Sequence, residues 1–251
     1  MTGPLSYIGG KNRLATKIIS LLPIHTTYVE PFAGGAQVFF HKPPSKVEIL
    51  NDLDGEIVNF FRICQSHYEE LVRYLRFTVV SRQWFDLLLR GEPGTLTDIQ
   101  RAARFFYIQK NAFGGLVLKQ NYGYHIGKTP NYNPARIPEI IQKTHERLQN
   151  VQIESLPYQK ILEKYDRKET LFYLDPPYWD RVLYKFNFNK EDFEELAREL
   201  AKLKGKFVLS LNDEPEVREI FSAFHISTAE VTYTVPQKGD RKVQELLITN
   251  F

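Results

Sequence analysis

Apolar and polar residues near the amino terminus follow the spacing of helices and strands in turn. The spacing of apolar residues over 12–22, ended by Pro23, predicts an amphipathic helix. Short apolar runs predict strands at 27–30 and 47–50, with a short helix at 36–41 between them. A strand, a glycine-rich turn, a helix and a second strand together make one βαβ unit.

The middle of the chain, from 56 to 150, has a helical pattern instead. Helical periodicity runs through 56–89, 96–109 and 138–148. Residues 112–134 are rich in Gly, Asn and Tyr, and their alternation predicts a hairpin or an ordered loop. We therefore expect a helical insertion with a hairpin near its end.

Strands return after residue 150, and they again alternate with helices. The expected strands are 151–153, 171–174, 207–211 and a closing antiparallel pair at 230–235 and 245–251, and the expected helices are 190–203 and 217–224. Alternating strands and helices at both ends predict an α/β fold with a mostly parallel sheet. We expect residues 1–55 and 151–251 to form one domain, into which 56–150 is inserted.

The composition excludes several classes of protein. The 251 residues are 43% hydrophobic and 25% charged, and no apolar run reaches the length of a membrane span. The start of the chain has no apolar signal region, so we expect a cytoplasmic protein. Cys64 is the single cysteine and the histidines have no ligand spacing, so neither a disulfide nor a metal site is expected.

Charge is informative through its distribution, because a net charge of +3 says little. The stretch 101–143 contains a single acid, Glu139, among several basic and aromatic residues. They are Arg101, Arg104, Lys110, Lys119, Lys128, Arg136 and Lys143, and Phe105, Phe106, Tyr107, Phe113, Tyr122, Tyr124 and Tyr132. Basic charge interleaved with rings suits a phosphate backbone and exposed bases. A solvated basic face over core aromatics is an equal alternative on this segment alone.

A first candidate site lies at the turn after the first strand. The turn reads Glu30, Pro31, Phe32, Ala33, Gly34 and Gly35, and the acid Asp52 ends the next strand. Adjacent glycines let a ligand approach the backbone, and the acid suits ribose hydroxyls of a nucleoside cofactor. A plain turn with Asp52 as a helix cap is the alternative. The pattern does not separate NAD from S-adenosylmethionine, although the missing G-x-G-x-x-G argues against NAD.

The most specific motif directly follows the apolar strand 171–174. It reads Asp175, Pro176, Pro177 and Tyr178. Ligands of α/β sheets bind beyond the carboxyl ends of strands, which is where this tetrapeptide falls. The prolines remove two N–H donors and leave acceptors, namely the carboxylate and a proline carbonyl. Two acceptors that hold the N–H groups of an adenine N6 amine would free its lone pair, and the carboxylate would stabilise the developing charge.

Tyr178 adds a ring that can stack on a base swung out of the duplex. The alternative is a proline-rich turn with a surface tyrosine, and we regard it as the weaker interpretation because the motif follows a buried strand.

Two further segments are weaker signals. Residues 7–11 read Tyr-Ile-Gly-Gly-Lys, and the Lys11 ammonium with the glycine N–H groups could hold a carboxylate, such as that of S-adenosylmethionine. An ordinary N-terminal turn is equally compatible. Residues 210–213, Ser-Leu-Asn-Asp, either line the pocket or cap a helix.

Taken in order, these motifs resemble the Dam-like (D12 class, alpha group) DNA adenine-N6 methyltransferases over nearly the whole chain. Residues 7–11 resemble the family's N-terminal motif, 30–35 its cofactor motif and 175–178 its catalytic motif. Asn51-Asp52, 210–213 and 241–248 also resemble family segments. Asp175 favours adenine, because relatives that act on cytosine N4 usually carry Ser there and glutamine methylases usually carry Asn.

The resemblance implies a Rossmann-like, S-adenosylmethionine-dependent methyltransferase fold with a helical target-recognition insertion. It implies cofactor contacts at Tyr7, Lys11, Glu30, Phe32, Gly34, Asp52 and Asp175. It also implies double-stranded DNA as partner and a protein that is monomeric in solution. DNA contacts are expected at Lys110, Asn111, Phe113, Leu116, Leu118, Lys119, Tyr122, Arg241 and Lys242, where Phe113 would fill the gap left by the flipped adenine.

Two positions depart from Dam itself. Ser6 and Leu118 stand where Dam carries basic residues that contact guanine, and a basic side chain is the usual guanine reader, so a GATC target is not expected. The alternatives that stay open from sequence are a methyltransferase for another amine, an NAD-linked dehydrogenase and a DNA-binding module without catalysis.

Overall fold

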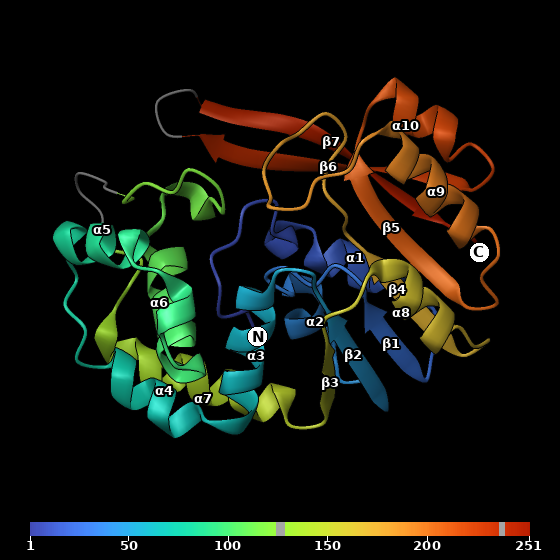
Figure 1. The fold of residues 1–251 in the computed structure, drawn as a ribbon. Coiled ribbons are helices and arrows are strands. Elements are labelled where there is room, and N and C mark those ends of the chain that lie inside the picture. Colours follow the sequence, from blue (N-terminus) through green and yellow to red (C-terminus); the bar gives the residue numbers. More distant parts are fainter. Residues whose placement is uncertain (124–128, 236–238) are drawn as a thin grey trace.

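A computed structural model describes residues 1–123, 129–235 and 239–251, with residues 231–235 and 239–242 described as backbone alone. A seven-stranded sheet runs through the molecule in the order β3-β2-β1-β4-β5-β7-β6 (Figure 1). The strands are β1 Thr27–Glu30, β2 Val47–Asn51, β3 Val151–Glu154, β4 Thr170–Leu174, β5 Lys206–Asn212, β6 His225–Val235 and β7 Gly239–Thr249. The first five are parallel, and β7 runs antiparallel to both of its neighbours. The expected α/β fold with a closing antiparallel pair is confirmed.

Helices cover both faces of this sheet. One face packs under α1 Ala15–Leu21 and α2 Gln37–His41, and the other under α8 Tyr158–Tyr165, α9 Lys190–Leu200 and α10 Pro215–Ile220. Strand β4 shows why its sequence is apolar throughout. Leu171 and Tyr173 belong to one core, and Phe172 and Leu174 to the other, so every residue of this central strand is buried.

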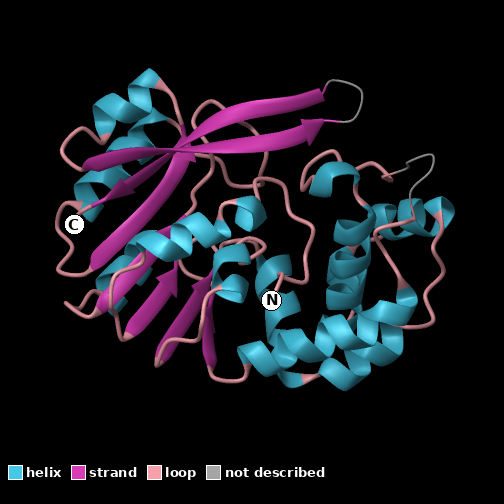
Figure 2. Ribbon diagram, turned by 180° about the vertical axis from the view of Figure 1, so that it is seen from behind, coloured by secondary structure: helices cyan, strands magenta, loops and turns pink. Residues whose placement is uncertain are grey.

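The helical insertion lies between β2 and β3 and stands beside the sheet (Figure 2). Its main helices are α3 Gly55–Ser66, α4 Tyr68–Leu75, α5 Arg82–Arg90, α6 Asp98–Asn111 and α7 Ile137–Leu148. The insertion shares its core with one face of the sheet, since the Phe61 ring packs 6.1 Å from that of Phe40. Arg147 on α7 also binds Glu48 on β2 at 2.5 Å. These contacts hold the insertion against the sheet.

Two local expectations differ from the structure. The helix expected at 12–22 is divided into a 3-10 turn, Lys11–Arg13, and α1, and the sequence patterns did not predict α8. A hairpin or an ordered loop was expected at 112–134, and the described residues there contain a 3-10 turn, Phe113–Gly115, and an isolated antiparallel bridge from Ala112 to Tyr122. Residues 124–128 of that segment, and 236–238 of the expected C-terminal turn, lie outside the described residues.

Within these described ranges, every helix is too short or too polar to cross a membrane. The same ranges contain no group of three or more His, Cys, Asp or Glu side chains placed to hold a metal ion.

Candidate active site

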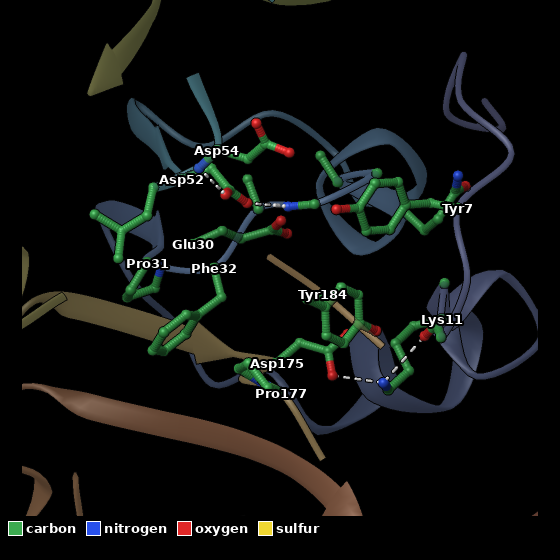
Figure 3. Close-up of a pocket in the computed structure, with 18 of the residues that line it drawn as sticks. Tyr7, Lys11, Glu30, Pro31, Phe32, Asp52, Asp54, Asp175, Pro177 and Tyr184 are labelled. Atoms are coloured by element: carbon green, nitrogen blue, oxygen red, sulfur yellow. Dashed lines mark hydrogen bonds and ion pairs between the residues drawn. The ribbon is translucent and has the colours of Figure 1, made fainter. Parts of the chain in front are cut away.

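The carboxyl ends of β1, β2 and β4 meet at one edge of the sheet, around a cavity that is open to solvent. Glu30 ends β1, Asp52 follows β2 and Asp175 follows β4 (Figure 3). Residues 7–11 line the same cavity, and Lys11 in this segment contacts Asp175. Residues far apart in sequence meet here because consecutive parallel strands end at the same edge.

The glycine turn and Asp52 form one hydrogen-bonded unit. The Gly34 N–H donates to Asp52 Oδ2 at 2.8 Å, and the Asp54 N–H donates to Asp52 Oδ1 at 2.8 Å. Gly34 has a φ of +48°, and a Cβ there would come within 3.1 Å of the Tyr7 ring. Burial raises the pKa of Asp52 to about 6. The turn thus holds a carboxylate at the rim of the cavity.

Glu30 lines the same cavity at the end of β1, but it is buried. The Tyr28 hydroxyl donates to Glu30 Oε1 at 2.7 Å. Burial raises the pKa of Glu30 to about 8, against which the Tyr28 hydrogen bond acts only in part. Glu30 is therefore mostly protonated and neutral near pH 7.

An aromatic wall closes one side of the cavity. The ring of Phe32 lies 5.3 Å from that of Tyr158 and 5.7 Å from that of Phe188. Of these three residues, only Phe32 was predicted from the sequence. Tyr158 and Phe188 come from the start of α8 and from the loop before α9, and this fold brings them together.

Asp175 and Tyr178 belong to a polar cluster with the buried residues Lys11, Ser210 and Glu245. Asp175 Oδ1 accepts hydrogen bonds from Lys11 Nζ at 2.5 Å and from Ser210 Oγ at 3.2 Å. The Tyr178 hydroxyl accepts from Lys11 Nζ at 2.8 Å and donates to Glu245 Oε1 at 2.6 Å. Burial raises the pKa of Asp175 to about 6. The positive charge of Lys11 partly opposes this increase, and the negative charge of Glu245 adds to it.

Lys11 lines the cavity and is paired with an acid of the site. We expected its ammonium to hold a carboxylate of the cofactor, but it lies against Asp175 with 3% of the residue exposed. Burial alone would lower the pKa of Lys11, but Asp175, Tyr178 and Glu245 outweigh burial and raise that pKa well above its ordinary value. The raised pKa favours the ammonium form of Lys11, which lies beside the Asp175 carboxylate.

The loop between the catalytic motif and α9 covers the cavity. The Tyr184 ring stacks on Tyr7 with 6.1 Å between centroids, and the Tyr184 hydroxyl donates to the Ile8 carbonyl at 3.2 Å. Lys185 Nζ lies 2.7 Å from Asp54 Oδ1. These residues were not among the predicted site residues, although the alternating aromatic residues Tyr184, Phe186 and Phe188 soon after the motif were a usable signal.

The turn expected to contact DNA lies against the cofactor side of the site. The Ile8 N–H donates to the Gly115 carbonyl at 3.0 Å, and the buried Gln109 amide donates to the carbonyls of Ser6 and Gly115 at 2.7 Å each. Phe113 at the tip is 50% exposed. Its ring is therefore presented outward from a turn whose base is fixed to the segment 6–8.

Other residues expected at the DNA surface have varied positions. Lys119 is exposed, with a φ of +49°, whereas Leu116, Leu118 and Tyr122 are half-buried. Lys110 is half-buried, and burial, followed by the charge of Arg136, lowers its pKa. The side chains of Arg241 and Lys242 lie outside the described part of the chain.

Asn111 does not suit its expected role. The residue is buried, and its side-chain amide donates to the Tyr107 carbonyl within α6 at 2.9 Å. Because the amide is used inside the helix, it is not presented to DNA.

Comparisons with known proteins identify the family of this chain. The family profile for D12 class N6 adenine-specific DNA methyltransferases matches residues 7–235. The type II methyltransferase M1.LlaDCHI of Lactococcus lactis subsp. cremoris is 28% identical over 98% of this chain and 94% of its own. The DNA adenine methylase of Salmonella typhi is 26% identical over 97% of this chain and 93% of its own.

A solved structure, precorrin 8w decarboxylase from Methanobacterium thermoautotrophicum, matches with a TM-score of 0.42 and 10% identity over 100% of this chain and 99% of its own. The family match spans residues 7–11, the glycine turn 30–35 and residues 175–178, and it separates this chain from NAD-linked dehydrogenases. The protein therefore belongs to the D12 class of N6 adenine-specific DNA methyltransferases.

Proposed function

We propose that the cavity binds S-adenosylmethionine and that Asp175 and the Pro176 carbonyl hold the N6 amine of an adenine extruded from double-stranded DNA. The observation that carries this proposal is the position of Asp175. Its Oδ1 is fully engaged by Lys11 and Ser210, while no described residue hydrogen-bonds its Oδ2. One oxygen is thus anchored and the other is available at the cavity.

The residues around the cavity fit each part of this cofactor. The rings of Phe32, Tyr158 and Phe188 suit a purine, and the Asp52 carboxylate suits ribose hydroxyls. A side chain is disfavoured at Gly34 in the adjacent turn, since its φ is +48° and its Cβ would lie 3.1 Å from the Tyr7 ring. When bound, the cofactor supplies a methyl group that is activated on a sulfonium.

The chain's own groups prepare the amine. Asp175 Oδ2 and the Pro176 carbonyl oxygen each accept one N6–H, which draws the nitrogen away from conjugation with the purine ring. Positive charge then develops on N6, and the carboxylate beside it stabilises that charge. Asp175 must be ionised to do this, and the Lys11 ammonium at 2.5 Å favours the ionised form. The excess N6 proton leaves toward Asp175 Oδ2 or solvent.

Substitution of Asp175 tests the assignment. We expect Asp175→Ala to reduce transfer of tritiated methyl from S-adenosylmethionine to DNA by at least about a thousandfold, because both the acceptor and the stabilising charge are lost. Calorimetric titration with S-adenosylhomocysteine should show binding within a few-fold of wild type. The matched control is Glu163→Ala, an exposed carboxylate on α8. Near-wild-type turnover in Asp175→Ala would reject the role assigned to Asp175.

The DNA side of the proposal places Phe113, Leu116 and Lys119 at the duplex. Phe113 is an exposed ring on a turn that lies against the cofactor segment, which suits a ring that fills the space of an extruded base. We expect Lys119→Ala to weaken DNA binding and to reduce the slope of log K against log salt by about one, with cofactor binding unchanged. Lys160→Ala, an exposed lysine on α8, is the control, and equal effects of the two substitutions would refute a phosphate contact at Lys119.

A further inference from the structure

Glu245 is a buried acid that the catalytic chemistry above does not use. It lies on β7, opposite Asn212 of β5, and only 3% of it is exposed. Its Oε1 accepts the Tyr178 hydroxyl at 2.6 Å and lies 3.0 Å from Lys11 Nζ. The residues after it on the strand, 246–248, are buried and apolar. The apolar residues therefore account for the packing of β7 there, and an acid is not needed for that packing.

Stability alone does not explain this acid. Burying a carboxylate costs several kcal/mol before pairing, and an apolar residue of similar size is often at least as stable. Lys11 is already paired with Asp175, so Glu245 makes a second acid that shares one cation. With both acids ionised, the cluster carries a net charge of −1.

Glu245 also fixes Tyr178. The Tyr178 hydroxyl accepts a hydrogen bond from Lys11 and donates one to Glu245, so its position is defined from two sides. The remainder of the Tyr178 residue is half-buried, next to Asp175. Without Glu245 the hydroxyl would keep the hydrogen bond from Lys11 but lose the acceptor for its own proton, and the ring would be held from one side only.

We propose that Glu245 is a positioning residue for methyl transfer, which holds the Tyr178 ring and the Lys11 ammonium in place and keeps the cluster negative toward the reacting amine. This inference rests on the proposed role of Asp175. Glu245 does not touch the amine and acts through its two partners. A negative cluster suits the reaction, because positive charge develops on N6 as the methyl group arrives.

The charge of Glu245 has a consequence that can be measured at Asp175. The groups that face Asp175 are Lys11 from the 3-10 turn, Tyr173 from β4, Ser210 from β5, Glu245 from β7, Tyr178 and Tyr184 from the segment after β4, and Glu30 from β1. Burial raises the pKa of Asp175 most strongly, and the negative charge of Glu245 adds to this effect. Removing that charge should therefore make Asp175 easier to ionise.

The test is a pair of substitutions measured by single-turnover methyl transfer on the full chain across a pH series. Glu245→Gln keeps an acceptor for the Tyr178 hydroxyl but removes the charge. We expect its maximal rate to stay within about tenfold of wild type, and the acid limb of its pH profile to move down by about one pH unit. Glu245→Ala removes both, and we expect its maximal rate to fall at least about thirtyfold with little change in affinity for S-adenosylhomocysteine.

Glu48→Gln is the matched control, because Glu48 is a buried strand glutamate paired with Lys42 and Arg147. It should alter thermal stability without moving the acid limb. A double-mutant cycle between Glu245→Ala and Tyr178→Phe should be non-additive in rate, since each change removes the hydrogen bond from the Tyr178 hydroxyl to Glu245.

An unmoved acid limb in Glu245→Gln, or an additive cycle, would overturn the inference, and the glutamine variant decides it even if Glu245→Ala does not fold. An active Asp175→Ala would instead refute the proposed function, so the two failures are distinguishable.

Discussion

Replacing Glu30 by glutamine should flatten the dependence of stability on alkaline pH. Glutamine has the shape of a protonated glutamic acid, and its carbonyl oxygen can still accept the Tyr28 hydroxyl, which bonds Glu30 at 2.7 Å. The difference is that glutamine cannot ionise. The substitution therefore removes the titration at this position while it preserves packing.

The expected size follows from the pKa of Glu30, which burial raises from 4.5 to about 8. A raised pKa means that the folded state binds a proton that the unfolded state has released, so stability falls as pH rises through the folded-state value. Between the unfolded-state and folded-state pKa values, the free energy of unfolding falls by about 1.4 kcal/mol per pH unit. From about pH 6.5 to about pH 9, Glu30 alone therefore lowers the free energy of unfolding by about 2 kcal/mol.

Urea denaturation of the ligand-free protein at several pH values measures this effect. Over that pH interval, the free energy of unfolding should fall by about 2 kcal/mol more in wild type than in Glu30→Gln. Asp52→Asn is the matched control, because burial raises the pKa of Asp52 only to about 6, so its titration lies mostly below the interval. Equal alkaline losses in wild type and Glu30→Gln would refute the reasoning, as would a flattened profile in Asp52→Asn.

Three shorter predictions concern the site and its support. Lys11→Met should raise the acid limb of the pH–rate profile by about two pH units, because the cation 2.5 Å from Asp175 is lost, and an unmoved limb would contradict the pairing. Tyr184→Ala should weaken S-adenosylhomocysteine binding by about tenfold in calorimetry, because the stacking of Tyr184 on the Tyr7 ring is lost, whereas Tyr184→Phe should keep most of the affinity. Gly115→Ala should lower the thermal midpoint and weaken DNA binding, since its φ is +68° and its Cβ would lie 2.9 Å from the Ser6 carbonyl, and a wild-type midpoint would refute this strain.

Local physics accounts for the parts of the fold that the sequence predicted well. Strand 171–174 was evident because a central parallel strand is buried on both faces and must be apolar throughout. The insertion was evident because its periodicity differs from that of the strands around it. Helix α8 was missed, since its apolar positions form a short stripe after a short strand, which is a weak periodic signal.

The amino-acid sequence by itself determined the chemistry that is available: the glycine turn with Asp52, the acceptors at 175–178, and a family pattern that spans most of the chain. Only the tertiary structure decided which groups meet. Lys11 pairs with Asp175 over 164 positions, and Glu245 reaches both Lys11 and Tyr178 from the last strand. Such pairings depend on the order of the strands and on which carboxyl ends lie side by side. Neither is visible in the periodicity of the sequence, because burial and distance are set by the tertiary structure.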